Sequence, residues 1–188
     1  MSGSGVRRRD CAGTGAEVGS DGMGGSAEIS GVVKQHGGEQ ETGRRERISL
    51  TRAYQFCAAH RLHTSALPDD VNQKVYGKCN NPHGHGHNYT VLVTVEVDWD
   101  PQEGLRLDLS ALDHLVRERI VARFDHRHLN HDPAFTELVP TGENLARIIW
   151  EELVHAIPTG RLKKIGLVET RDNVFEYVGA ETRIPTES

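Results

Sequence analysis

Residues 79–97 read CNNPHGHGHNYTVLVTVEV, and most of the fold prediction starts from this stretch. Its segment Tyr89–Val97 alternates β-branched and apolar residues, which predicts a strand. If the strand begins a few residues before Asn88, His85 and His87 point to the same face, because side chains alternate along a strand. Neutral imidazoles are the commonest protein ligands of zinc. The stretch therefore predicts a strand that carries two ligands of one metal site.

Three further strands are expected around this one. Ile48–Leu62 precedes it, and Lys163–Thr170 and Val174–Val178 follow near the C-terminal end, joined by a turn at residues 171–173. The segment His63–Lys78 is expected to be a loop. Two strands joined by a loop of this length favour an antiparallel pair.

Two helices are expected between the two pairs of strands. Ser110 is a good N-cap for the first helix, in which apolar residues recur at helical spacing and which should end near Phe124. Thr141 caps the second helix, which Pro158 and Gly160 stop. One four-stranded antiparallel sheet with two helices on one face satisfies this order of elements. The predicted fold class is therefore α+β.

The apolar residues are unevenly distributed along the 188-residue chain. Hydrophobic residues make up 36% of the sequence, and residues 1–46 hold most of the glycines and almost no large apolar side chains. Such a segment buries too little apolar surface to offset the entropy of ordering it. We therefore expect a disordered Gly-rich tail at residues 1–46 and one folded domain at residues 47–188.

Charge, cysteines and hydropathy exclude several classes of protein. The net charge of -5 does not suggest binding to nucleic acid. No apolar stretch approaches the length of a membrane span, and none follows the arginines at positions 7–9 as it would in a secretory signal. The three cysteines, Cys11, Cys57 and Cys79, do not have the spacing of a disulfide scaffold, so a reduced, cytoplasmic protein is expected.

The third ligand of the metal site is expected to be His60. It shares its strand parity with Phe56 and Ala58, so it can face the two histidines of the neighbouring strand. His63 competes for this role but lies three residues further on, at the start of the loop, and His83 is a second spare histidine. An incidental His-rich tract is the alternative for the whole run. Three histidines that leave a fourth position open are typical of catalytic zinc.

Cys79 lies in the loop before the two histidines, where it is either a fourth ligand or a reactive thiolate. A nearby cation lowers the pKa of a thiol and makes it a usable base. The alternative is a buried, inert cysteine. Cys57 fits that alternative better, because alanines follow it within a strand.

Two acidic residues are further candidates for the site. Asp125 precedes His126 after the first helix, and a carboxylate beside an imidazole can orient it and raise its basicity. The alternative is a histidine that merely complements the helix dipole.

Glu169 shares a strand face with Ile165 and Leu167, so its carboxylate needs donors, such as the two adjacent N–H groups of an aminopyrimidine ring. The alternative is a frayed strand end in water.

Taken together, these residues resemble the 6-pyruvoyl-tetrahydropterin synthase family over roughly Ile48–Gly179. The matching motifs are FCAAHRL at residues 56–62, GKCNNPHGHGHNY at residues 77–89, Asp125-His126, TGEN at residues 141–144 and Val168-Glu169-Thr170. The resemblance implies zinc on His60, His85 and His87. It implies that Cys79 abstracts a proton, and that Asp125 and His126 complete a triad with it across a subunit boundary. It also implies that Glu169 anchors a pterin and that Thr141 contacts the substrate.

The family's fold is the tunnelling fold, in which trimers close their sheets into a barrel and two trimers stack as a hexamer. The implied substrate is 7,8-dihydroneopterin triphosphate, and the implied product is 6-pyruvoyl-tetrahydropterin, formed with loss of triphosphate. Lys78, Arg127 and Arg171 are only candidates for holding the triphosphate. No membrane or nucleic-acid partner is expected.

A sister branch makes 6-carboxytetrahydropterin for queuosine synthesis from the same substrate. Its cysteine lies closer to the histidine pair, whereas Cys79 lies six positions before His85 and is followed by Asn-Asn-Pro, as in the pyruvoyl type. Gly142 and His83 depart from the pyruvoyl pattern. A non-catalytic metal-binding protein on this fold is the alternative from another class, and it predicts that Cys79 and His126 are dispensable.

Overall fold

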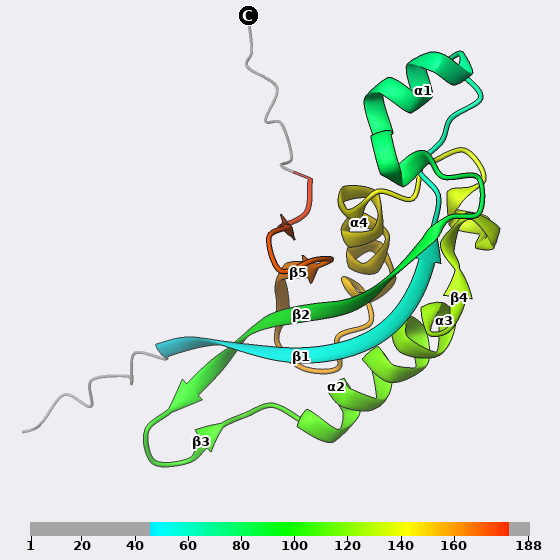
Figure 1. The fold of residues 1–188 in the computed structure, drawn as a ribbon. Helices are drawn as coiled ribbons and strands as arrows, with labels where there is room; N and C mark the ends of the chain where they lie inside the picture. Colours follow the sequence, from blue (N-terminus) through cyan, green and yellow to red (C-terminus); the bar gives the residue numbers. More distant parts are fainter. Residues whose placement is uncertain (1–45, 181–188) are drawn as a thin grey trace, which may run out of the picture. The chain divides into compact units, whose positions relative to one another are not determined.

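The computed structural model describes residues 46–180 (Figure 1). The prediction of a disordered tail therefore falls outside the described residues, except at Glu46, which is the first residue of a strand and not part of the tail. The strands, α-helices and short helical turns follow in the order β1 (Glu46–His60), α1 (Asp69–Tyr76), η1 (Gly77–Asn80), β2 (His85–Asp100), β3 (Gly104–Leu105), α2 (Leu109–Val116), η2 (Arg117–Val121), α3 (Ala122–Phe124), β4 (Arg127–His128), η3 (Leu129–His131), η4 (Pro133–Phe135), α4 (Gly142–Leu153), β5 (Arg161–Val168) and β6 (Val174–Tyr177).

The four long strands form the predicted antiparallel sheet. The strand order is β4-β1-β2-β5-β6, and β3 pairs with the far end of β2. The pairs β1–β2, β2–β5 and β5–β6 are antiparallel, whereas β4 lies parallel to β1. The prediction of four strands missed β3 and β4, because two residues are too few to produce an alternating pattern.

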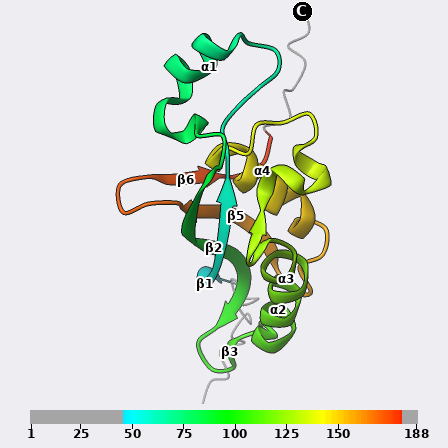
Figure 2. The same cartoon turned by 45° about the vertical axis from the view of Figure 1, so that its right-hand side comes forward.

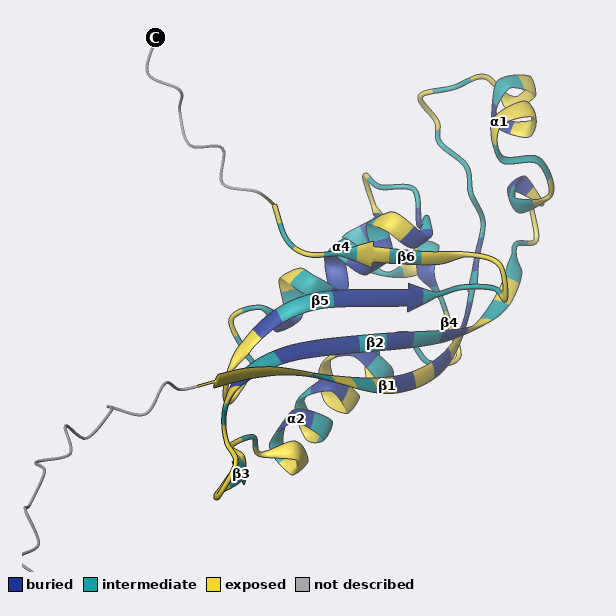
Figure 3. Ribbon diagram, turned by 90° about the vertical axis from the view of Figure 1, so that its left-hand side faces the viewer, coloured by how far each residue is buried: buried dark blue, intermediate teal, exposed yellow. Residues whose placement is uncertain are grey.

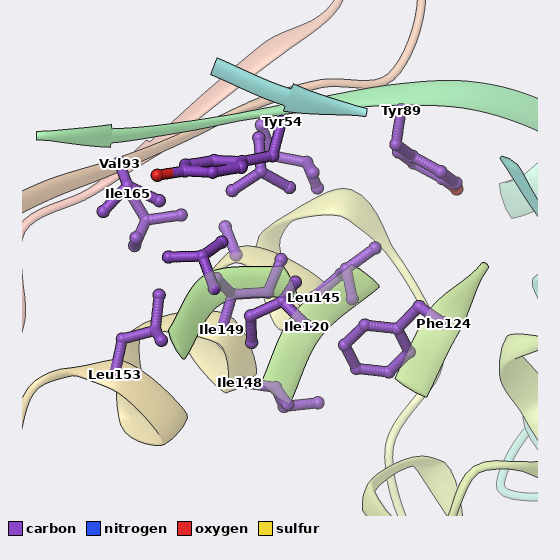
Figure 4. Close-up of a cluster of buried hydrophobic side chains, with 14 of the residues drawn as sticks. Tyr54, Tyr89, Val93, Ile120, Phe124, Leu145, Ile148, Ile149, Leu153 and Ile165 are labelled. Carbon is purple, nitrogen blue, oxygen red and sulfur yellow. The ribbon is translucent and has the colours of Figure 1, made fainter. Parts of the chain in front are cut away.

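One face of the sheet is covered by helices, and the other is open. In β1 the buried residues Tyr54, Phe56 and Ala58 alternate with exposed ones, and Phe56 lies opposite the buried Tyr89 of β2. Figures 2 and 3 show α2, α3 and α4 on the buried side of the sheet. Figure 4 shows that side chains of the sheet, such as Ile165, meet those of the helices in one apolar cluster. This face carries the core, as the alternation of the sequence predicts.

A bulge in β5 keeps the apolar side chains of this strand on the core face. Thr94 pairs with Lys164, but the next residue, Val95, pairs with Leu162, so β5 contains one extra residue at this point. The extra residue changes the parity of the strand. As a result both Leu162 and Ile165 are buried, and the residues that follow Ile165 at every second position also face the core.

Both predicted helices are present at the expected positions, with three differences. Thr141 caps α4 as predicted, but Asp108 and not Ser110 caps α2, because its carboxylate accepts a hydrogen bond from the backbone of Ala111. The first long helix contains a π-helical turn, η2. The expected loop after β1 contains α1, whose few apolar residues gave no helical pattern. No helix between residues 46 and 180 is long and apolar enough to span a membrane.

Candidate metal centre and active site

Three histidines meet on the core face at one end of β1 and β2. His60 is the last residue of β1 and lies opposite His85, the first residue of β2, while His87 lies opposite Ala58. The strand β2 therefore begins early enough to place both of its histidines on one face. One nitrogen atom from each ring lies within 4.8 Å of the others. The structure thus brings together the three histidines that the sequence analysis selected.

The surroundings of His60 fix which of its nitrogens can bind a metal. Its side chain is buried, and Nδ1 lies 2.8 Å from the carbonyl oxygen of Pro140. A carbonyl can only accept, so Nδ1–H donates and Nε2 keeps its lone pair. Burial lowers the pKa of His60 to about 4, so the ring is neutral at pH 7. His60 is therefore held in the form that a metal ligand requires.

The donor set fits a tetrahedral divalent metal. Nε2 of His60 lies 3.1 Å from Nε2 of His85. Two nitrogens bound to one tetrahedral zinc lie about 3.3 Å apart. Burial also lowers the pKa of His85, and among the described residues its buried Nδ1 has no hydrogen-bond partner. Three imidazoles brought this close together form a candidate metal centre.

Glu169 lies beside the three histidines. One of its carboxylate oxygens is 3.8 Å from Nε2 of His60 and 3.5 Å from the hydroxyl of Tyr89, and only 12% of its side chain is exposed. Its backbone N–H donates to the carbonyl of Asn173, which holds the end of β5 in place. Glu169 is therefore not at a frayed end in water. Its carboxylate faces the candidate metal centre from the core side of the sheet.

Cys79 lies in η1 and is half-buried. Its carbonyl accepts a hydrogen bond of 2.8 Å from the backbone of Leu62, which fixes the segment next to the end of β1. Burial, and to a smaller extent the carboxylate of Glu169, raises the pKa of the Cys79 thiol.

Asp125 and His126 form a hydrogen-bonded pair at the end of α3. Nδ1 of His126 lies 2.9 Å from one carboxylate oxygen of Asp125, and the other oxygen accepts a hydrogen bond of 2.8 Å from the backbone of Cys57. These bonds lower the pKa of Asp125. His126 has a φ of 55°, an unusual conformation for a residue other than glycine, and its side chain is 81% exposed. The backbone is thus strained where it presents an imidazole to solvent.

The pair lies on the other side of the sheet from the histidine cluster. His126 lines a cavity of about 460 Å³ together with Cys57 and Asn88, which alternate with the core-facing residues of β1 and β2, and His87 of the histidine cluster also borders this cavity. Within residues 46–180, no hydrogen bond or ion pair joins Cys79 to Asp125 or His126. The structure of one chain therefore does not bring the three predicted catalytic residues together.

Three other residues considered in the sequence analysis, Thr141, His63 and Cys57, make hydrogen bonds to near neighbours. The hydroxyl of Thr141 accepts from the backbone of Asn144, 3.4 Å away, so it caps α4. His63 contacts the side chain of Asn80 and lies outside the three-histidine cluster. The prediction that Cys57 is buried was wrong, because Cys57 points to the open face, where its thiol donates to Asn88.

Sequence reasoning missed two neighbours of the candidate metal centre. Pro140 contributes only a backbone carbonyl, and a carbonyl leaves no signal in a sequence. Tyr89 is buried, and its hydroxyl lies 3.4 Å from Nδ1 of His60 and near Glu169. Its place two residues after His87, on the same parity, is a signal that could have identified it.

An antiparallel sheet with helices on one face and a cluster of three histidines at one end defines a candidate metal-dependent enzyme. Comparison with known proteins identifies the family within this class. The model of the family described as 6-pyruvoyl tetrahydropterin synthase matches residues 49–180. The 6-pyruvoyl tetrahydrobiopterin synthase of Homo sapiens is 43% identical over 138 residues, which cover 73% of this chain and 95% of the relative. The protein of that name from Drosophila melanogaster is 40% identical over 132 residues, which cover 69% of this chain and 79% of the relative.

Solved structures agree with the sequence comparison. The structure of Caenorhabditis elegans 6-pyruvoyl tetrahydropterin synthase matches with a TM-score of 0.68 and 36% identity, covering 73% of this chain and 99% of the other. An uncharacterized protein from Wolinella succinogenes has a TM-score of 0.55 at 18% identity, covering 72% and 99%, and shares the fold. The chain therefore belongs to the 6-pyruvoyl tetrahydropterin synthase family. The predictions of the family, of the tunnelling fold and of an enzyme are confirmed.

Proposed function

We propose that the protein is a zinc-dependent lyase that converts 7,8-dihydroneopterin triphosphate to 6-pyruvoyl-tetrahydropterin and releases triphosphate. Family membership supports a pterin substrate. The observation that carries the proposal is the carboxylate of Glu169, 3.8 Å from a nitrogen of the three-histidine cluster. A recognition group for the pterin ring and a metal centre for its side chain would thus lie side by side.

The proposed metal ligands are His60, His85 and His87. Three imidazoles leave one position of a tetrahedral zinc open, which is the arrangement of catalytic zinc sites. When bound, zinc supplies Lewis acidity to hydroxyl groups of the substrate side chain. The carbonyl of Pro140 keeps the His60 ring in its productive orientation, because it holds Nδ1 at 2.8 Å.

Glu169 is proposed to anchor the pterin. Its carboxylate can accept two N–H groups from the aminopyrimidine edge of the ring as a bidentate pair. The side chain is mostly buried, so few water molecules compete for these hydrogen bonds. The hydroxyl of Tyr89, 3.5 Å away, helps to orient the carboxylate.

Cys79 is proposed to take a proton from a carbon atom of the substrate side chain. Because burial and Glu169 raise the pKa of its thiol, Cys79 needs a second group that removes the proton of the thiol itself. The proposed group is His126, with Asp125 holding its imidazole at 2.9 Å. A base of this kind contributes about 10²–10⁴-fold to the rate.

The Cys79 and the His126 of one active site are proposed to come from different chains. Within residues 46–180 no hydrogen bond or ion pair joins them, and His126 is 81% exposed beside an open cavity. A homo-oligomer can cover this cavity with a neighbouring subunit and complete the site. A hexamer built as a dimer of trimers, together with a contact between Thr141 and the substrate, follows only from the family resemblance and is part of the same proposal.

The test is to incubate purified, zinc-loaded protein with 7,8-dihydroneopterin triphosphate and to identify the products by mass. We expect 6-pyruvoyl-tetrahydropterin and inorganic triphosphate. A product with the mass of 6-carboxytetrahydropterin would assign the chain to the queuosine branch instead. No turnover by a correctly folded, metal-loaded protein would favour a non-catalytic metal-binding role. The Cys79→Ala variant, prepared in the same way, measures any background reaction.

A further inference from the structure

The segment that carries Cys79 needs an anchor. It consists of α1 and η1, and α1 packs mainly against η1 rather than against the sheet (Figure 1). A short segment with few apolar contacts to the core opens easily. Next to Cys79, however, the side chain of Asn80 is buried, which is unusual for a polar residue in a loop.

Arg61 holds this buried asparagine. Nε of Arg61 donates to the carbonyl of Asn80 at 3.2 Å, and a terminal nitrogen of the same guanidinium donates to its Oδ1, also at 3.2 Å. Nδ1 of His63 lies 3.1 Å from that Oδ1 and can donate to it as well. In the tautomer with the proton on Nδ1, His63 donates to Oδ1 of Asn80; in the other tautomer, Nδ1 accepts from the Arg61 guanidinium, 3.3 Å away.

Arg61 is in turn fixed at its backbone. Its N–H donates to Oδ1 of Asn130 at 2.8 Å, and Nδ2 of Asn130 donates to its carbonyl at 2.9 Å. Asn130 lies in η3, directly after β4. Arg61 itself follows His60, the last residue of β1 and a proposed metal ligand. One arginine thus links the end of β1 and η3 to the segment that carries Cys79.

We propose that Arg61 and Asn80 are positioning residues that hold Cys79 beside the end of β1, where the three-histidine cluster lies. The inference rests on the proposed role of Cys79. Neither residue needs to contact the substrate, because both act through the position of Asn80, the residue next to Cys79. A displacement of a catalytic group by about 1 Å can cost on the order of 10² in rate. The two donors of the planar guanidinium match the two oxygen atoms of Asn80, and a lysine cannot reproduce this geometry.

The first experiment compares Asn80→Ala and Arg61→Met with the parent protein. We expect kcat to fall by roughly 10–100-fold while KM and the amount of bound zinc stay within about twofold, because the metal ligands and Glu169 are untouched. Arg61→Lys should behave like Arg61→Met, since charge alone does not restore the paired hydrogen bonds. Arg106→Met is the matched control, because Arg106 is exposed, pairs with Glu103 and lies near β3, away from the site.

The second experiment does not depend on turnover. In a Cys11→Ser, Cys57→Ser background, Cys79 is the only thiol, and its rate of alkylation by iodoacetamide reports how firmly it is held. We expect Asn80→Ala and Arg61→Met to accelerate alkylation several-fold, and the double variant to be no faster than the faster single one, because both changes break the same link.

The outcomes separate this inference from the proposed function. Faster alkylation supports the positioning role of Arg61 and Asn80 even if another pterin proves to be the substrate. An unchanged alkylation rate in Asn80→Ala overturns this positioning role, whether or not kcat falls. Any decrease in kcat would then have a cause other than movement of Cys79. If Arg61→Met folds poorly or loses zinc, Asn80→Ala decides, since it removes only one side chain and leaves Arg61 bonded to Asn130. Independent, additive effects of the two substitutions also contradict the inference.

Discussion

The two sides of the sheet at the end of β1 and β2 are built differently. On the core side, His60 is buried, hydrogen-bonded to Pro140 and surrounded by His85, His87 and Glu169. On the open side, His126 is 81% exposed, is held by one carboxylate and has a strained backbone. The first arrangement is complete within one chain. The second presents an imidazole–carboxylate pair outward, and within residues 46–180 no hydrogen bond or ion pair joins the His126 ring to a side chain other than that of Asp125.

This difference indicates how the site is divided. In the proposed function, metal binding and recognition of the pterin use the desolvated, fixed groups of the core side. In the same proposal the exposed His126 deprotonates the Cys79 thiol of a neighbouring chain. The largest effects of mutation should therefore come from the core side.

The largest effect is expected for His60→Ala. It removes a ligand that is buried and already held in the correct tautomer, so the protein should lose its bound zinc and all measurable turnover. His63→Ala is the matched control and should retain full zinc, because His63 contacts Asn80 instead. Bound metal is measured by atomic emission after dialysis. Zinc retained by His60→Ala but lost by His63→Ala would show that the third ligand is misassigned.

Cys79→Ala should be nearly as damaging but for another reason. We expect it to keep its zinc and to lose turnover by a factor of roughly 100 or more, because a general base is removed while the metal ligands remain. Steady-state kinetics and metal analysis of the same sample check this. If zinc is lost together with activity, Cys79 is a metal ligand and its role as a base must be dropped.

On the open side, His126→Ala should lower kcat by roughly 10–100-fold and leave zinc binding unchanged. The free energy of unfolding should hardly change, because the imidazole is mostly exposed and the bond from Asp125 to Cys57 remains. Asp125→Asn should give a smaller loss of kcat, since the histidine stays but is less well oriented. A large loss of stability in His126→Ala would mean that the pair has a structural role.

The smallest expected effect is the pH dependence of folding in the zinc-free protein. The pKa of His60 is lowered to about 4 in the folded state, so between about pH 6.5 and pH 4 only the unfolded chain binds a proton there. Stability is therefore fully present above about pH 6.5 and is lost as the pH falls, by about 1 kcal/mol between pH 7 and 5.5. Urea unfolding after chelation measures this, and His60→Gln should reduce the slope. An equal slope in that variant would assign the effect to other groups.

The core side of the site could be predicted from the sequence because strand parity carries direct spatial information. His60, His85 and Glu169 follow the alternation of apolar residues in their strands, and this alternation placed all three on one face. The open side could not be predicted in this way. Asp125 and His126 lie in a turn, where no periodicity applies, and the positive φ of His126 has no signature in residue type. The same holds for Pro140, whose contribution is a carbonyl.

Networks of polar side chains in loops could not be predicted from the sequence either. Asn80 and Arg61 are both visible in the sequence, but only the folded chain shows that they meet. The helix α1 was missed because it is largely solvated and its apolar residues are too few to form a stripe. Side chains that serve function through geometry, and not through packing, therefore need the structure.

The division of the site between chains is tested most directly by mixing two inactive variants. Cys79→Ala and His126→Ala are combined in equal amounts under conditions in which subunits exchange, and exchange is confirmed by mass analysis of the oligomers. If each site takes its Cys79 and its His126 from different chains, about a quarter of the sites in a random mixture contain both, and a corresponding part of the activity returns. No recovery despite confirmed exchange would mean that each chain supplies its own triad, and the account of a shared site would be wrong.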